Sequence, residues 1–256
     1  MDTSDLAKRM KRYEAVSKNV LMTRMPVVLR IDGKAFHTYT KGLDKPFDDI
    51  LIKAMQYTMK TLCENIQGCV LGYTQSDEIS LVLVDYQKLT SDAWFDYEVQ
   101  KIDSIAASMA TMAFNKEFSR LYRESGRAGS NEKIESKLGC AMFDCRSFNL
   151  AKEEVTNYPY WRQLDAIRNS IQMVGQANFS QNELQNESCS VIQSMLLEKG
   201  INWNDLATYK KRGSCCIKMV YADDIGFRNR WVIDGDIPVF AGSGRAYVDH
   251  LVYVGE

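Results

Sequence analysis

Apolar runs and amphipathic stretches alternate along the first 150 residues. Three runs rich in aliphatic and β-branched residues, at 26–32, 69–74 and 79–85, predict strands, and residues 138–148 are interpreted as a fourth. Apolar residues at helical spacing predict a helix that begins at Pro46 and a long helix over residues 94–118. The stripe expected to be buried on the long helix comprises Ile102, Ile105, Ala106, Met109, Met112 and Ala113. A short basic helix over residues 4–18 comes first, and residues 120–137 are expected to form a mobile surface loop.

The resulting order, β-α-β-β-α-β, is that of the ferredoxin-like fold, an α+β architecture with an antiparallel sheet and helices on one face. Right-handed crossovers would make the first two strands parallel and place the third, antiparallel, between them. Asp32 ends the first strand, and Asp77 lies in the turn between the second and the third. Both would then lie at one edge of the sheet, on strands about 4.8 Å apart. Taken singly, each segment also fits an ordinary turn.

Two carboxylates placed so close together repel each other unless a cation neutralises them. Hard oxygen ligands without histidine or cysteine favour Mg²⁺. Asp32 and Asp77 therefore predict a two-metal site suited to nucleotidyl transfer, in which one ion activates an attacking oxygen and the other stabilises a leaving one.

The second half of the chain is less regular. A helix is predicted from residue 158 to about 177, a second over residues 181–199 ending at Gly200, and a turn with a short helix over residues 200–206. The first helix is expected to bury Trp161, Leu164, Ile167, Ile171 and Val174, with Arg162 off that stripe. Closing strands are expected at residues 215–221, 230–233 and 237–240.

Composition limits the function classes more than it selects one. The 256 residues are 45% apolar and 25% charged with a net charge of −1, so a nucleic-acid binder would need its basic residues gathered on one face. The sequence contains neither a run of 18 apolar residues nor a signal-peptide pattern, so no membrane association is expected. Seven irregularly spaced cysteines and two histidines indicate a cytoplasmic protein with reduced thiols rather than a zinc site or a His-based triad.

Motifs spread over most of the chain give a specific resemblance. They are Arg30-Ile-Asp-Gly-Lys-Ala-Phe-His37, Lys45-Pro-Phe-Asp48, Gln75-Ser-Asp-Glu78, Lys101-Ile-Asp-Ser-Ile-Ala-Ala-Ser108, Tyr160-Trp-Arg-Gln163, Gly200-Ile-Asn-Trp-Asn-Asp-Leu206 and Lys211-Arg-Gly213. In this number and order they resemble the tRNA(His) guanylyltransferase superfamily of reverse, 3′–5′ polymerases, and in particular its guanylyltransferase-like branch. The resemblance implies a palm-like catalytic domain over residues 1–150. It also implies a C-terminal part, 151–256, that contributes to RNA binding and oligomerisation.

The resemblance also implies a role for each matched position. Asp32, Asp77 and the carbonyl of Gly33 would hold two Mg²⁺ ions, with Glu78 as a further catalytic carboxylate supporting them. The nucleoside triphosphate would lie along Gly33, Lys34, Ala35, Phe36, His37 and Ser76, with Lys45 and Lys101 neutralising its phosphates. From the residues alone, a surface lysine is the more common interpretation of Lys45, and a structural histidine that of His37. The candidates for contacts with RNA are Arg162, Arg168, Asn169, Lys210, Lys211 and Arg212.

The implied enzyme is a nucleotidyltransferase that activates the 5′-monophosphate of a tRNA with ATP and then adds GTP or another NTP there. Members of the family are typically homotetramers. Eukaryotic tRNA(His)-specific members carry His-Ile-Asn-Asn where this chain has Ala166, Ile167, Arg168 and Asn169. That departure favours template-dependent repair of 5′-truncated tRNA over non-templated addition of one guanosine to tRNA(His).

Two other functions share this fold. A nucleotide cyclase uses the same palm and the same two carboxylates, but it has no need of the Trp161–Asn169 and Trp203–Asp205 segments. A non-catalytic RNA-binding module would need aromatic residues exposed on its central strands. Residues 27–31 and 79–84 are expected to offer only aliphatic ones.

Overall fold

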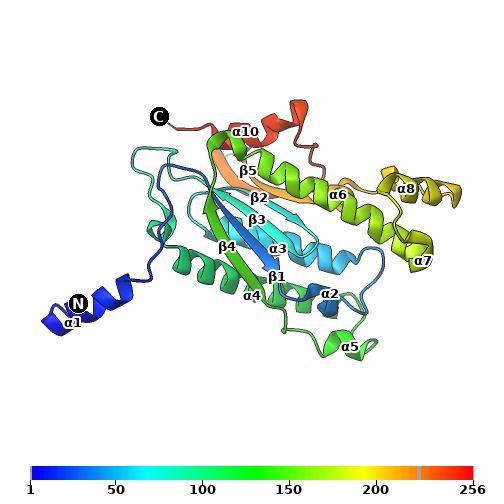
Figure 1. Cartoon of the computed structure of the whole chain (residues 1–256), viewed down its shortest axis with the longest axis horizontal. Coiled ribbons are helices and arrows are strands. Elements are labelled where there is room, and N and C mark those ends of the chain that lie inside the picture. The colour runs from blue at the N-terminus through cyan, green and yellow to red at the C-terminus, as the bar shows by residue number, and fades with distance from the viewer. Residues whose placement is uncertain (1, 224–225, 256) are drawn as a thin grey trace.

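Six antiparallel strands form one sheet in the order β4-β1-β3-β2-β5-β6 in the computed structural model, which describes residues 2–223 and 226–255 (Figure 1). The strands are β1 (Val27–Gly33), β2 (Cys69–Gln75), β3 (Glu78–Leu83), β4 (Phe143–Asn149), β5 (Ser214–Asp223) and β6 (Gly226–Asp234). The third strand lies antiparallel between the first two, as the right-handed crossovers predicted. The ferredoxin-like α+β fold is confirmed.

One face of the sheet is covered by α3 (Asp49–Asn65) and α4 (Val99–Glu124). Alternate residues of β1, among them Leu29 and Ile31, point into this core because side chains in a strand alternate between faces. The predicted stripe on the long helix was only partly right. Ile102 and Ala106 are buried, but Ile105 and Met112 are 39% and 73% exposed.

The rest of the buried stripe on α4 continues at a spacing of four residues. It comprises Ala110, Phe114, Phe118 and Tyr122. Because α4 runs on to Glu124, these later residues share one helix face with Ile102 and Ala106. The helix begins at Val99, after a short 3₁₀ segment at Trp94–Tyr97. The long helix was therefore predicted correctly in kind, but its bounds were wrong, and only Ile102 and Ala106 of the six residues expected on its stripe are buried.

The opposite face is covered by the C-terminal part, so the helices are not confined to one face of the complete sheet. Helices α6 (Asn157–Asn178) and α10 (Ala246–Val252) pack there (Figure 1). Val28, Tyr73 and Val82 are among the sheet residues in the core that these helices cover. Because β5 pairs with β2, residues beyond 150 also extend the same sheet by two strands.

Other expected boundaries shift. Pro46 precedes the helix instead of starting it, since Asp48 is the N-cap of α3 and accepts hydrogen bonds from its first turn. The predicted mobile loop contains the last turn of α4 and the short helix α5 (Glu132–Glu135). The helix expected over residues 181–199 is two helices, α7 (Gln181–Leu184) and α8 (Cys189–Glu198). Residues 237–240 form no strand, although Ile237 and Phe240 are buried.

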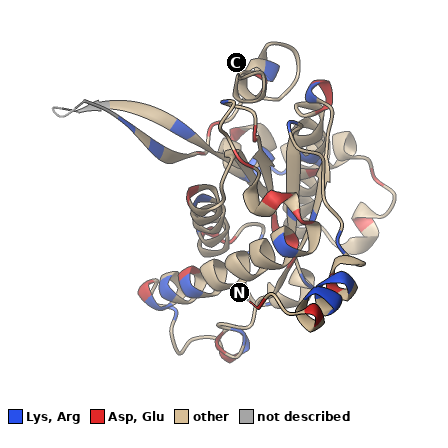
Figure 2. Ribbon diagram, turned by 90° about the vertical axis from the view of Figure 1, so that its left-hand side faces the viewer, with Lys and Arg blue, Asp and Glu red and all other residues tan. Residues whose placement is uncertain are grey.

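Two segments extend from the body. Helix α1 (Asp5–Ala15) is capped by Ser4, buries no residue and stands away from the sheet (Figure 1). Strands β5 and β6 form a long arm in Figure 2, with basic residues along it. None of the helices within the described residues combines the length and the apolar character needed to cross a membrane.

Candidate active site

Asp32 and Asp77 meet at one edge of the sheet, as the topology predicted. The backbone N–H of Gly33 donates to the carbonyl oxygen of Asp77 at 3.1 Å, and Asp32 pairs with Glu78 in the β1–β3 register. Burial is the largest cause that raises the pKa of the Asp77 carboxyl, and the nearby Asp32 carboxylate raises it further. The edge therefore concentrates negative charge that a cation would relieve.

The donor set at this edge fits Mg²⁺ that is shared with a substrate. Among residues 2–223 and 226–255, no three His, Cys, Asp or Glu side chains are grouped so as to hold a metal ion. Asp32 and Asp77 are both partly exposed, and Asp77 Oδ1 accepts a hydrogen bond from Ser76 Oγ at 2.9 Å. Mg²⁺ commonly takes one or two carboxylates and completes its shell with waters and substrate phosphates.

Glu78 lies opposite Asp32 in the β1–β3 register and is held by two guanidinium groups. Arg162 donates through Nε to Oε1 and through NH2 to Oε2, both at 2.7 Å, and Arg30 NH2 lies 3.0 Å from Oε2. Burial raises the pKa of Glu78, while the hydrogen bonds and charge of Arg162 lower it. Both oxygens of Glu78 are thus occupied by arginines.

Arg162 corrects the expectation for its helix. It is only 6% exposed, whereas Trp161 and Leu164, which were expected to be buried, are 53% and 47% exposed. Helical spacing treats arginine as a surface residue, but burial here is offset by the carboxylates of Glu78 and Asp165. Arg162 therefore lies beneath the candidate site and is not a freely exposed cation for RNA.

Residues 33–37, which follow Asp32, are held in place by packing against the core. Ala35 has a positive φ of 54° and caps the short helix α2 (Phe36–Tyr39). The Phe36 ring is buried against Phe114 and Phe143, while Lys34 and His37 are exposed. The backbone of residues 33–37 is consequently tied to the core, with its polar side chains facing outward.

The two lysines expected at the phosphates lie in different places. Lys45 is exposed in the loop before α3, next to the residues that line the cleft described below. Lys101 lies in the first turns of α4, with its ammonium 5.3 Å from the centre of the Phe95 ring. Thr111, which accepts a hydrogen bond from the N–H of Phe143, is the α4 residue level with Gly33. Lys101 is about 15 Å back along the helix from it, so its role at the phosphates stays a prediction.

A cleft lies beside the Ser76–Asp77 turn. It is bounded by Ser76, the start of α3, the middle of α6 and α9 (Thr208–Arg212), and its empty volume, part of it open to solvent, is about 570 Å³. Three of the residues considered for RNA, namely Asn169, Lys210 and Lys211, line it together with Ala166. The cleft therefore joins the sheet edge to the candidate RNA-binding residues.

Most of those basic side chains already have partners within the chain. Lys210 Nζ lies 2.8 Å from Asp49 Oδ1, and Lys211 Nζ donates to the carbonyl of Asn204 at 2.5 Å. Arg212 Nε donates to the carbonyl of Ile237 at 3.0 Å, and the exposed Arg168 pairs with Asp165. An RNA phosphate would share or replace these contacts.

Polar residues on the strands were missed from the sequence. Arg30 was quoted in a motif but counted within an aliphatic run, yet its guanidinium holds Glu78. Across the β1–β4 register, Arg146 faces Arg30 and Asp144 faces Asp32, and Arg146 NH2 donates to Asp144 Oδ1 at 3.0 Å. The signal was present as polar residues two apart on each strand, which places them on one face.

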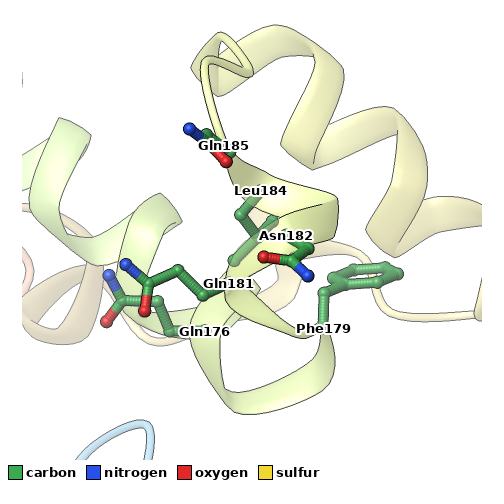
Figure 3. A pocket seen from close by; sticks show the side chains of 6 residues that line it. All are labelled: Gln176, Phe179, Gln181, Asn182, Leu184 and Gln185. Atoms are coloured by element: carbon green, nitrogen blue, oxygen red, sulfur yellow. The ribbon is translucent and has the colours of Figure 1, made fainter.

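A larger hollow lies elsewhere, at the far end of α6 around α7. Figure 3 shows that it is lined by amide side chains and two apolar ones, which are Gln176, Gln181, Asn182, Gln185, Phe179 and Leu184. None of these described lining residues is a carboxylate or a cation, and the empty volume of the hollow is about 1140 Å³. Its chemistry does not fit a nucleotide triphosphate with metal ions.

Comparisons with known proteins identify the family. Residues 7–151, more than half of the chain, match the family described as Thg1, tRNAHis guanylyltransferase. A bacterial Thg1-like protein solved in complex with ATP is 44% identical, with a TM-score of 0.85 over 98% of this chain and 100% of that one. The structure of a bacterial Thg1-like protein with GTP is 43% identical, with a TM-score of 0.80 over the same shares. A probable tRNA(His) guanylyltransferase of Dictyostelium discoideum is 28% identical over 81% of this chain and 82% of its own length.

Proposed function

We propose that this chain, which belongs to the tRNAHis guanylyltransferase family of nucleotidyltransferases, extends the 5′ end of tRNA in the 3′–5′ direction. The observation that carries the proposal is the meeting of Asp32 and Asp77 at one sheet edge, within the segment that matches the family. Similar bacterial proteins solved with ATP and with GTP support these two nucleotides as substrates.

The reaction has two displacements. In the first, a 5′-monophosphate oxygen of the RNA attacks the α-phosphorus of ATP, and pyrophosphate leaves. In the second, the 3′-hydroxyl of the incoming NTP attacks the 5′-phosphorus of the RNA, AMP leaves and a phosphodiester forms. Positioning and charge stabilisation dominate both steps.

The chain's own residues supply that positioning. Asp32, Asp77 and the carbonyl of Gly33 would hold two Mg²⁺ ions, which lower the charge on the reacting phosphates when bound. Ser76 orients Asp77 through its 2.9 Å hydrogen bond. The backbone of residues 33–37 would follow the triphosphate, and the exposed Lys45 would neutralise part of its charge.

Template-dependent repair is the activity we favour. Ala166 lines the cleft beside Ser76, at a position where tRNA(His)-specific relatives carry histidine in the motif His-Ile-Asn-Asn. A small side chain at Ala166 leaves room in that cleft for an RNA end that pairs with a template. We expect Arg168, Lys210 and Lys211 to contact RNA phosphates, and a homotetramer to share the tRNA between protomers.

The alternatives are weaker. β1 and β3, both fully described, carry no aromatic side chain, so a base-stacking RNA module has no platform on the central strands. If the chain were a nucleotide cyclase, the cleft bounded by α6 and α9 would have no function in its reaction.

The test supplies a labelled, 5′-truncated tRNA with a 5′-monophosphate, together with Mg²⁺, ATP and all four NTPs. Wild type is compared with Asp77→Ala. The control is Asp92→Ala, which removes an exposed carboxylate 15 residues further along the chain than Asp77. We expect template-matched extension by wild type and Asp92→Ala, and none by Asp77→Ala. Addition of a single guanosine to tRNA(His) alone would replace repair by histidine-specific addition, and cyclic nucleotide without extension would indicate a cyclase.

A further inference from the structure

The ion pair between Arg162 and Glu78 is the most buried charged contact beside the candidate site. Arg162 is 6% exposed and Glu78 is 3% exposed. Two parallel N–H···O bonds of 2.7 Å join them, which is the geometry in which arginine holds a carboxylate most firmly. Burying two charges is costly, and removing either partner leaves the other uncompensated.

We propose that Arg162 is a positioning residue for the metal site, acting through Glu78 on the turn that carries Asp77. The inference rests on the proposed function. Glu78 directly follows Asp77 and lies opposite Asp32 and Gln75 in the sheet register. A fixed Glu78 therefore fixes the peptide that positions the Asp77 carboxylate.

The contacts of Glu78 show why it serves as an anchor and not as a metal ligand. Besides Arg162, its carboxylate pairs with Arg30 at 3.0 Å and accepts from Ser80 Oγ at 3.4 Å. Ser80 in turn lies 3.1 Å from the hydroxyl of Tyr158. A cation would have to displace the Arg162 guanidinium to reach Oε1, and the guanidinium groups of both Arg162 and Arg30 to reach Oε2.

The Arg162–Glu78 ion pair, here called the clamp, is also held in place at its Arg162 end. Arg162 also pairs with Asp165 one turn later on α6, at 3.0 Å. The next residue, Gln163, donates to the carbonyl of Pro238 and accepts from the N–H of Phe240, both at 2.9 Å. Helix α6 is thereby fixed to the C-terminal segment, so it can hold the turn against the repulsion between Asp77 and Asp32.

The test measures binding of Mn²⁺ alone to the full chain, by the electron paramagnetic resonance signal of free Mn²⁺. Variants are Arg162→Gln, Glu78→Gln and their double mutant, with circular dichroism to check folding. The control is Arg120→Gln, which removes a two-bond arginine–glutamate pair on the exposed side of α4. Groups that orient metal ligands typically change affinity by about 10–100-fold.

We expect Arg162→Gln and Glu78→Gln each to raise the Kd for Mn²⁺ by about 10-fold or more. The double mutant should bind no more weakly than either single one, because both changes break the same clamp. Arg120→Gln should match wild type. Arg162→Lys keeps the charge but loses the two-bond geometry. If Arg162→Gln does not fold, the Kd of Arg162→Lys for Mn²⁺ is measured in its place.

Two results would overturn the inference. In the first, Glu78→Gln loses Mn²⁺ binding, but a folded Arg162→Gln (or Arg162→Lys, if Arg162→Gln does not fold) binds Mn²⁺ with wild-type affinity. That result would show that Glu78 is itself a metal ligand. The other is additive losses in the double mutant. A wild type that binds no Mn²⁺ would overturn the metal site of the proposed function, and this inference with it.

Discussion

Replacing Gly33 by alanine tests how the nucleotide-binding stretch is joined to the core. A Cβ atom at Gly33 would lie 2.3 Å from Cδ2 of Phe36 and 2.7 Å from its Cγ. Ordinary carbon–carbon contacts are about 3.5–4.0 Å, so the ring or the strand must move by roughly 1 Å or more. The ring cannot move freely, because it is 3% exposed and packs on Tyr39, Phe114 and Phe143.

The expected cost follows from the two ways to relieve this clash. Overpacking a core typically costs about 1–3 kcal/mol. Expelling the ring would cost about as much as removing it, roughly 3–5 kcal/mol. We therefore expect Gly33→Ala to lower the free energy of unfolding by about 2–4 kcal/mol, and to impair nucleotide addition because the N–H of Gly33 also holds Asp77.

The measurement is urea unfolding followed by circular dichroism. Gly235→Ala is the matched control, since its Cβ would meet Tyr209 at an ordinary 3.5 Å. Phe36→Leu combined with Gly33→Ala should recover part of the loss, because the smaller side chain makes room for the new methyl group. A Gly33→Ala variant as stable as the Gly235→Ala control would refute the packing argument.

Three further predictions follow from the same structure. Phe114→Ala, at a fully buried position of α4, should lower the free energy of unfolding by about 3–5 kcal/mol in urea titrations, and a loss below about 1 kcal/mol would contradict its placement in the core. Lys137 Nζ donates to the carbonyls of Thr38, Tyr39 and Lys41 at 2.9–3.0 Å, so Lys137→Met should cost about 1–3 kcal/mol, whereas the exposed Lys133→Met should be neutral. Because the folded state raises the pKa of Asp77 above the ordinary value of 3.8, it binds more protons than the unfolded chain, and the metal-free free energy of unfolding should fall as pH rises above that value. Asp77→Asn should reduce this slope in urea titrations with a chelator, and an unchanged slope would show that Asp77 does not carry it.

The sequence was sufficient to predict the meeting of Asp32 and Asp77. Strand runs, helix spacing and the right-handed crossover rule place both residues at one edge without knowledge of side-chain packing. These signals are local or topological. The first three strands lie within two residues of their predicted bounds, whereas β4 begins at Phe143 instead of residue 138 and residues 237–240 form no strand. Where a boundary depended on packing, as with the end of α4, the prediction was less accurate.

The burial of Arg162, and the core on the face of the sheet that α6 and α10 cover, could be learned only from the tertiary structure. Periodicity assigns arginine to the surface, and nothing near Arg162 in the chain shows that Glu78, 84 residues away, would receive it. Likewise, β5 pairs with β2 and α6 covers the face of the sheet that α3 and α4 leave open. The sequence by itself determined which carboxylates share an edge, because backbone topology controls that. Which charged side chains are buried beneath them depends on long-range partners that offset the loss of hydration, and only the folded chain brings those partners together.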